Sequence, residues 1–452
     1  MTRIHLGLIW ASATLFAWAV LLAGANEAWS QGGQFRQPVG GISIDAAGTI
    51  STASIDESRL LRDAILAASP GIERQADDLK RPTTLRKVSL RALQAALQEH
   101  LSRKEPIPDE VRYLAGLQTI QHVFVYPDRN DIVLAGFGEG WKVDDRGFVV
   151  GITTGRPVLL LDDLTVALRS VLNADSLTCS IDPTADGLLR LQEYVNSLAS
   201  AGRDIRLLQS TIEQRLGLQK ISIDGIDPSS HLARVMIAAD VKMKRIAMAL
   251  DRSPVAALPS YMSMISGGGR GVNNLLPRWW LTSDYAPLLH TEDKTAWEIK
   301  GQGVKAVSVE DRLSADGSIE RSVRQGGATQ RWADQMTSKY AELAVKEPIF
   351  GQLRGVMDLT IVAALISHEH LAERAALDLS VLLEQAPVEQ YPIALQTPSI
   401  AQAILKGTSL VISASGGVEL KPLAIVREQQ TSDKLNVVRD AAATAANRWW
   451  WN

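Results

Sequence analysis

The amino-acid sequence predicts an α+β fold, with a mixed α/β body that contains hairpins, a helical segment after it and a small C-terminal hairpin. Strand-like and helix-like patterns alternate through residues 177–224, as expected where sheets and helices share a domain. Residues 332–383 have a helical pattern that is interrupted at Pro348. Residues 409–420 alternate around two adjacent glycines in the manner of a hairpin.

Length and composition indicate a globular protein that does not bind nucleic acid. The chain has 452 residues, of which 46% are hydrophobic and 21% are charged, and this length is enough for two or three compact units. Its 47 Lys and Arg are balanced by 50 Asp and Glu, so no broad basic field would attract a phosphate backbone. Cys179 is the only cysteine, which excludes an intramolecular disulfide.

The first thirty residues predict export from the cytoplasm. Arg3 and His5 precede an apolar run over residues 6–22, and small residues follow at Ala23-Gly24-Ala25, the order found in a signal peptide. The run is long for a signal peptide, so an uncleaved N-terminal membrane anchor is the alternative. Both predictions place the body in the periplasm, at the cell surface or in the medium.

The mature chain divides by composition into four regions. Residues 31–84 are expected to form a flexible leader with a small hairpin at residues 41–52, and residues 85–326 the mixed α/β domain. Residues 327–386 are a helical segment packed on that domain, and their apolar run at residues 356–366 is too short to span a bilayer, which predicts a buried helix. The C-terminal hairpin, an Ala-rich helix and a Trp tail make up residues 387–452.

Within the mixed domain, periodicity assigns the elements in order. Ser89 is the expected N-cap of a helix whose leucines recur every four residues, and a short helix follows at residues 109–117. A hairpin is predicted next, then strands, a helix to about residue 172, and alternating strands and helices as far as residue 224. Later strands are expected at residues 231–237, 279–285, 297–299 and 307–309, the last two joined across Gly301-Gln302-Gly303.

Several segments of the body resemble a known but uncharacterised family. They include "Asp131-Ile132-Val133-Leu134-Ala135-Gly136", "Thr154-Gly155-Arg156-Pro157-Val158", "Cys179-Ser180-Ile181-Asp182-Pro183-Thr184" and "Pro277-Arg278-Trp279-Trp280". In these segments the chain is similar to a family of exported planctomycete proteins that is catalogued as a domain of unknown function. The resemblance implies export from a planctomycete cell, but no activity, cofactor or catalytic residue.

A candidate ligand-binding site lies around Arg278, Trp279 and Trp280. Neighbouring residues on a strand point to opposite faces, so one indole should enter the core while the other faces outward. With Arg278 and Tyr285, the outward indole could stack on a sugar ring or a peptide side chain. The alternative, favoured because aromatic pairs in mixed domains are usually buried, is that both indoles pack in the core.

Asp162 and Asp163 form a second candidate site, at the point where a predicted strand passes into a helix. Carboxylates there often line the crevice of an α/β enzyme, where one of them could act as a catalytic acid or base. The same position suits capping of the helix, which is the default interpretation.

Other motifs give no predicted metal or cofactor site. His368 and His370 are two residues apart, so on a helix they would point about 200° apart, and Cys179 has no basic neighbour in sequence to activate it. The Gly-rich segment at residues 266–271 is expected to be a plain loop. Trp449, Trp450 and Trp451 should either dock on the protein or lie at a membrane interface, a second route to membrane contact besides the N-terminal run.

These observations favour an exported, non-catalytic protein that binds or scaffolds in the cell envelope, with an envelope glycan or protein as its partner. The alternative hypothesis is a hydrolase that acts on envelope glycans or peptides through loop carboxylates, Asp162 or Asp163 among them.

Overall fold

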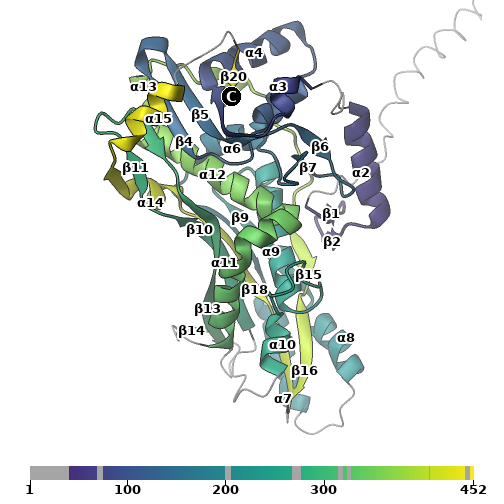
Figure 1. The fold of residues 1–452 in the computed structure, drawn as a ribbon. Helices are drawn as coiled ribbons and strands as arrows, with labels where there is room; N and C mark the ends of the chain where they lie inside the picture. The colour runs from purple at the N-terminus through teal and green to yellow at the C-terminus, as the bar shows by residue number, and fades with distance from the viewer. Residues whose placement is uncertain are drawn as a thin grey trace, which may run out of the picture. The chain divides into compact units, whose positions relative to one another are not determined.

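Two seven-stranded β-sheets and the helices packed on them dominate the described part of the chain (Figure 1). The computed structural model describes residues 40–68, 75–198, 205–266, 276–313, 319–322, 327–406, 408–442 and 448–452. Residues 38–452 fold as one unit, distinct from residues 1–37. The predicted signal peptide or anchor (1–30), the start of the predicted leader and most of the Gly-rich loop lie outside the described residues.

The first sheet, called here the β10 sheet, combines strands from distant parts of the sequence. In spatial order its strands are β14 (Ile319–Ser322), β13 (Gly301–Leu313), β10 (Leu276–Tyr285), β18 (Ser415–Leu420), β8 (Leu177–Asp182), β9 (Leu218–Asp224) and β15 (Gln396–Pro398). β10 and β18 are parallel, and the other neighbours are antiparallel. Gly416 lets β18 approach β10: its φ is +113°, and a Cβ there would lie 1.8 Å from the carbonyl oxygen of Trp279.

The second sheet, the β5 sheet, ends on one side in the C-terminal Trp residues. Its order is β19 (Gln429–Thr431), β11 (Leu288–His290), β12 (Ala296–Glu298), β4 (His122–Tyr126), β5 (Asp131–Gly138), β3 (Thr83–Ser89) and β20 (Trp450–Trp451). Trp450 lies opposite Val88, and the Arg86 guanidinium stacks on its ring at 5.3 Å. Trp450 and Trp451 are both buried, so the tail docks on the protein itself and these indoles are not free to face a membrane.

Three smaller hairpins complete the strands in the described residues. They are β1 (Ile42–Ile44) with β2 (Ile50–Thr52), β6 (Trp141–Val143) with β7 (Val149–Gly151), and β16 (Ala401–Lys406) with β17 (Thr408–Ser413).

The helix α12 (Pro348–His368) is the centre of the core. It contacts α6 (Leu161–Val171), α9 (His231–Ala247), α11 (Ala328–Lys346) and α14 (Pro422–Arg427). Among the described helices it is the one long and apolar enough to cross a membrane, yet 83% of its most apolar window is buried inside the protein. The prediction of a buried core helix at residues 356–366 is therefore confirmed.

The remaining helices are shorter or lie further from α12. They are α2 (Ile55–Ala68), α3 (Asp77–Lys80), α4 (Leu90–Arg103), α5 (Asp109–Arg112), α7 (Ala185–Leu198), α8 (Ile205–Leu216), α10 (Tyr261–Ser266), α13 (Leu371–Arg374) and α15 (Lys434–Ala442). Single 3₁₀ turns occur at Leu114–Gly116 and Pro127–Arg129, and a π turn at Val381–Gln385.

The α+β class is confirmed, as are the elements whose patterns are local. The Ser89 side chain accepts a hydrogen bond from the backbone N–H of Ala92 and caps α4. The predicted hairpin at residues 41–52 forms, and the hairpin predicted after the short helix forms between β4 and β5. The helical segment breaks at Pro348 as expected, because a proline fits the first turn of a helix but not its interior.

Two of the predicted strand pairings were wrong. β12 pairs with β4 and β11, whereas β13 pairs with β10, so no hairpin forms across Gly301-Gln302-Gly303. Similarly, β17 pairs with β16, while β18 enters the β10 sheet between β10 and β8. An alternating pattern identifies a strand, but its partner is set by packing between distant segments. Residues 387–452 thus contribute strands to both sheets, and their separate hairpin is β16 with β17 rather than the predicted pair.

Three segments have a different local structure from the one predicted. Residues 231–237 are the start of the helix α9, capped by Ser230, and not a strand; they are buried on every side, which hides the helical period. Residues 157–160 are extended but make only a single bridge, between Val150 and Pro157. Residues 55–68 of the predicted leader form the helix α2.

Candidate functional site

Trp279 and Trp280 lie on opposite faces of the β10 sheet, as the alternation of a strand requires. Trp279 has no exposed surface, and its ring packs 4.9 Å from Trp332 of α11 and 5.1 Å from Tyr261 of α10. Its indole N–H donates to the carbonyl oxygen of Thr329. Trp279 is therefore a core residue on the side of the sheet that α9 and α11 cover (Figure 1).

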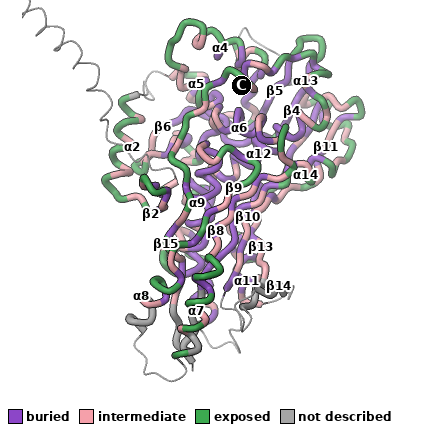
Figure 2. Tube along the Cα trace, turned by 180° about the vertical axis from the view of Figure 1, so that it is seen from behind, coloured by how far each residue is buried: buried purple, intermediate pink, exposed green. Residues whose placement is uncertain are grey.

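The other side of the sheet carries Trp280 and is only partly covered. We call it the open face, formed by the half-exposed residues Ser180, Asp182, Ser222, Arg278, Trp280, Thr282, Lys305, Val307 and Val309. Seen from behind, the β10 sheet mixes buried and intermediate residues (Figure 2). The face is closed at the Leu276 end, where leucines of α7 and α8 and Ala401 of β16 pack with Leu276, and β17 also contacts β10.

Arg278 holds Trp280 in place on the open face. Its guanidinium lies 5.1 Å from the centre of the Trp280 ring, and it forms a 3.2 Å ion pair with Asp182 of β8. Across the strands, Trp280 is level with Val307 on one side and Gly417 on the other. Gly417 has no side chain that could pack on the indole from β18.

Tyr285 does not belong to this group. After an irregularity at the end of β10, its hydroxyl donates to Oδ1 of Asp358 at 2.5 Å. Burial and the neighbouring carboxylate raise the pKa of Tyr285 well above its usual value. Of the predicted ligand-binding residues, the structure thus leaves Arg278 and Trp280 together on one face, places Trp279 in the interior and turns the half-buried Tyr285 toward Asp358.

Asp162 and Asp163 lie in the first turn of α6, and neither one caps it. The N-cap is Leu160, which makes no side-chain cap, so the default interpretation was wrong. The Asp162 carboxylate instead accepts a hydrogen bond from the backbone N–H of Glu389 at 3.0 Å. Both oxygens of Asp163 lie 3.0 Å from Nδ1 of His231, the first residue of α9.

The Asp163–His231 pair is buried, and the two side chains are in direct contact. Asp163 is 4% exposed and His231 is 7% exposed. Burial disfavours the charged imidazole, but the charge and hydrogen bond of Asp163 outweigh it and raise the pKa of His231 above its usual value. Burial also raises the pKa of Asp162.

Residues 387–391 lie over the pair. The ring of Tyr391 lies 6.2 Å from that of His231, and the Arg234 guanidinium stacks on Tyr391 at 4.8 Å. The Tyr391 backbone N–H donates to the carbonyl oxygen of Ser229, which fixes this segment at the start of α9.

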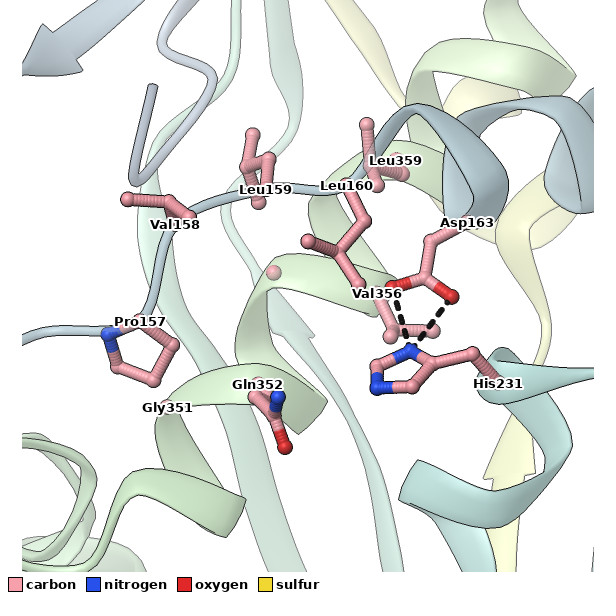
Figure 3. A pocket seen from close by; sticks show the side chains of 11 residues that line it. Pro157, Val158, Leu159, Leu160, Asp163, His231, Gly351, Gln352, Val356 and Leu359 are labelled. Carbon is pink, nitrogen blue, oxygen red and sulfur yellow. Dashed lines mark hydrogen bonds and ion pairs between the residues drawn. The ribbon is translucent and has the colours of Figure 1, made fainter. Parts of the chain in front are cut away.

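A small pocket adjoins this pair, between residues 157–160 and the helix α12 (Figure 3). The second ring nitrogen of His231 points away from Asp163, toward the side of the pocket where Gln352 lies. Oε1 of Gln352 is buried and has no hydrogen-bond partner within the described residues. The space open to the centre of a water molecule is about 10 Å³, enough for about one water.

Two glycines of α12 shape this pocket. A Cβ on Gly351 would come within 2.7 Å of the Pro157 ring, and one on Gly355 within 2.7 Å of the Leu159 side chain. Their spacing of four residues puts both on one side of the helix. Residues 157–160 therefore lie directly on the backbone of α12.

The other sequence candidates have contacts within the protein. Cys179 is fully buried, and burial raises the pKa of its thiol. His368 ends α12, while the Glu369 carboxylate accepts hydrogen bonds from Lys294 and Gln429. Within the described residues, no three His, Cys, Asp or Glu side chains are grouped so that they could hold a metal ion.

The sequence analysis missed His231 and Gln352. His231 is 68 residues from Asp163, and the two meet only because α6 and α9 both pack against α12. Ser230, an N-cap residue type before an apolar stretch, was the available signal for the start of α9. No sequence signal indicated that the first residue of that helix would face Asp163.

Comparison with known proteins identifies one segment. Residues 179–261 match a family model described as "Protein of unknown function (DUF1598)", in agreement with the predicted resemblance to a domain of unknown function. The match extends from β8 through α9 and includes His231, but neither Asp163 nor Trp280. No curated protein and no solved structure matches the chain.

The two indoles should differ sharply in their contribution to stability. Trp279→Ala is expected to lower the free energy of unfolding by about 3–5 kcal/mol, because it empties a fully buried site. Trp280→Ala should cost about 1 kcal/mol or less, since it removes a half-exposed ring and one cation–π contact. Urea unfolding of both variants measures this difference, and equal losses would contradict the assignment of opposite faces.

The His231–Asp163 pair should make stability depend on pH. The folded-state pKa of His231 lies above the ordinary 6.5, so its contribution is complete below pH 6.5 and is lost as pH rises through the folded-state pKa. In urea unfolding from pH 5 to 9, the stability difference between wild type and His231→Gln should therefore shrink with rising pH. His290→Gln, at a histidine outside the pocket, is the control and should follow the wild-type profile. A stability difference between wild type and His231→Gln that stays constant across this pH range would contradict a raised folded-state pKa of His231.

Proposed function

We propose that this protein is an exported, non-catalytic binding protein of the cell envelope, and that its open face binds a glycan. The observation that carries the proposal is Trp280, a large aromatic side chain held by Arg278 on a sheet face that is otherwise mainly polar. The core does not need this indole, because Trp279 fills the interior from the same strand.

The chemistry of the open face suits a sugar chain. A sugar ring has an apolar C–H face, which can lie on an indole, and an edge of hydroxyl groups, which need hydrogen-bond partners. The hydroxyl groups of Thr282, Ser180 and Ser222 lie on the same face as Trp280. Because neighbouring strands are about 4.8 Å apart, these groups lie within the length of a short oligosaccharide.

The charges on the face favour a ligand with little net charge. Arg278 and Lys305 are offset by Asp182 and by Glu419, which is level with Thr282 on β18. The whole chain has a net charge of −3. Electrostatic attraction of a polyanion such as nucleic acid is therefore not supported, whereas a neutral or zwitterionic glycan would meet no opposing field.

The envelope location rests on the N-terminal sequence. The apolar run at residues 6–22 and the small residues after it have the order of an export signal. Outside the cytoplasm, the glycans of the envelope are the abundant ligands that a flat aromatic face would encounter.

Binding to insoluble envelope glycan tests the role of the open face. The full-length protein should co-sediment with purified peptidoglycan sacculi, and Trp280→Ala should weaken binding about tenfold or more because the stacking platform is lost. Tyr194→Ala is the matched control, since Tyr194 also carries a stacked arginine, Arg215, but lies on α7. Equal binding by wild type and Trp280→Ala would reject the open face as the site.

Export can be tested separately. When the full-length gene is expressed with its own N-terminus, the protein should be found outside the cytoplasm, and N-terminal sequencing should place cleavage after the small residues near position 25 or 30. Replacing two leucines of the apolar run with arginine should retain the protein in the cytoplasm. Recovery of the unaltered chain from the cytosol would contradict the proposal.

A further inference from the structure

We propose that the open face selects an N-acetylated amino sugar, with Lys305 and Val307 binding its acetamido group and Glu419 its hydroxyl groups. This preference rests on the proposed glycan binding at Trp280, and it names the sugar that the indole would hold. The side chains that carry it stand level with Trp280 and with Thr282 on the two neighbouring strands.

Only one face of the Trp280 ring is available to a sugar. The Arg278 guanidinium lies over the other face, 5.1 Å from the ring centre, and its ion pair with Asp182 holds it there. The Arg278 side chain is 15% exposed, so a ligand could not replace it on the indole without breaking that ion pair. Arg278 and Thr282 flank Trp280 along β10, one on each side, so the available ring face is on the Thr282 side.

The Thr282 side of the indole faces away from the closed end of the open face. At the closed end, residues of α7, α8 and β16 pack with Leu276. Level with Thr282 stand Lys305 on β13 and Glu419 on β18, and their side chains are 44% and 34% exposed. A sugar ring stacked on the indole would therefore lie over Thr282, between these two charged groups.

The ion pairs of Lys305 and Glu419 leave both groups able to bind a ligand. Nζ of Lys305 is 3.8 Å from Oδ1 of Asp284, and Glu419 pairs with Lys421 at 2.9 Å. Such surface pairs contribute little to stability, so each long side chain can turn toward a ligand at small cost. Neighbouring strands are about 4.8 Å apart, which puts the backbones of Lys305 and Glu419 about 10 Å apart. The two side chains can thus reach opposite edges of one sugar ring.

The two sides of this site differ in chemistry. On the β18 side, the Glu419 carboxylate accepts hydrogen bonds, and Gly417, level with Trp280, has no side chain. This side suits sugar hydroxyl groups, which can donate to the carboxylate. On the β13 side, the Lys305 ammonium can only donate, and the half-exposed Val307 is apolar. This side suits a group that combines an acceptor with an apolar end.

An acetamido group has this combination. Its carbonyl oxygen has two acceptor lone pairs for the Lys305 ammonium, and its methyl group can lie against Val307, two residues further along β13. A hydroxyl group at the same position could accept from Lys305, but it would place no apolar atoms on Val307. The acetamido group is also uncharged, in agreement with the balanced charges of the open face. These contacts distinguish a 2-acetamido sugar from the corresponding plain hexose.

Two sugar trimers that differ only at the 2-position test this preference. In calorimetric titration, the full-length protein should bind the β-1,4-linked trimer of N-acetylglucosamine about tenfold more tightly than that of glucose, as expected for one added charge-assisted hydrogen bond. Lys305→Met should bring the two affinities to within about threefold, because it removes that donor and keeps the apolar stem. Val307→Thr, which keeps the shape of the side chain, should reduce the preference several-fold. Glu419→Gln should weaken both trimers to a similar extent, since it replaces a charged acceptor with a neutral one.

Lys346→Met is the matched control and should keep the wild-type preference. Lys346 also pairs with a glutamate, Glu342, and its side chain is 46% exposed, but it lies on α11, which covers the other side of the β10 sheet (Figure 1). No binding of the acetylated trimer, equal binding of the two trimers, or an unchanged preference in Lys305→Met would overturn the proposed selectivity. If the trimers bind equally while Trp280→Ala still loses sacculus binding, the open face binds a glycan without selecting acetylated sugars. Sacculus binding that is unchanged in Trp280→Ala rejects the glycan site and the selectivity together.

Discussion

One buried carboxylate connects the two sheets. Asp358 on α12 is 1% exposed and accepts hydrogen bonds from the Tyr285 hydroxyl at 2.5 Å and from the backbone N–H of Ile120 at 3.1 Å. Tyr285 ends β10, and Ile120 leads into β4 of the other sheet. An apolar helix can rotate or slide in an apolar core at little cost, but a buried carboxylate that loses its donors is strongly destabilising. Asp358 therefore sets the rotation of α12 relative to both sheets.

The geometry of the pocket follows from that rotation. With Asp358 directed at Tyr285 and Ile120, Gly351 and Gly355 face residues 157–160 and let that segment lie on the helix. The segment leads directly into α6 and so places Asp163 opposite His231. A helix with a larger residue at either glycine would push residues 157–160 away and move Asp163 with them.

The sequence identified the elements much better than their partners. Ser89, Pro348 and the leucines of α4 act through neighbours a few residues away, so periodicity and capping chemistry were sufficient to predict them. The position of β18 depends on Gly416, whose role appears only when β10 lies beside it. The candidate site divides in the same way: alternation along a strand predicted opposite faces for Trp279 and Trp280, whereas the favoured interpretation that both indoles pack in the core was wrong for Trp280, which is only half-buried. Alternation could not reveal that His231 would meet Asp163, because that contact is made by packing.

The helix α9 connects the Asp163–His231 pair to the β10 sheet through one rigid element. His231 is its first residue, and thirteen residues later Lys244 is fully buried behind the β10 sheet. The Lys244 ammonium donates to Oδ2 of Asp240 and to the carbonyl oxygens of Ile181 and Gly416, so all three of its N–H groups are used. It thereby joins β8 to β18 next to the strand that carries Trp280. At 1.5 Å per residue, His231 and Lys244 are about 20 Å apart along the helix axis.

The family match at residues 179–261 contains β8 and α9 but not Trp280 or Asp163. The matched segment thus contains the strand and the helix that Lys244 joins, together with His231, whereas Trp280 and Asp163 come from the rest of the chain.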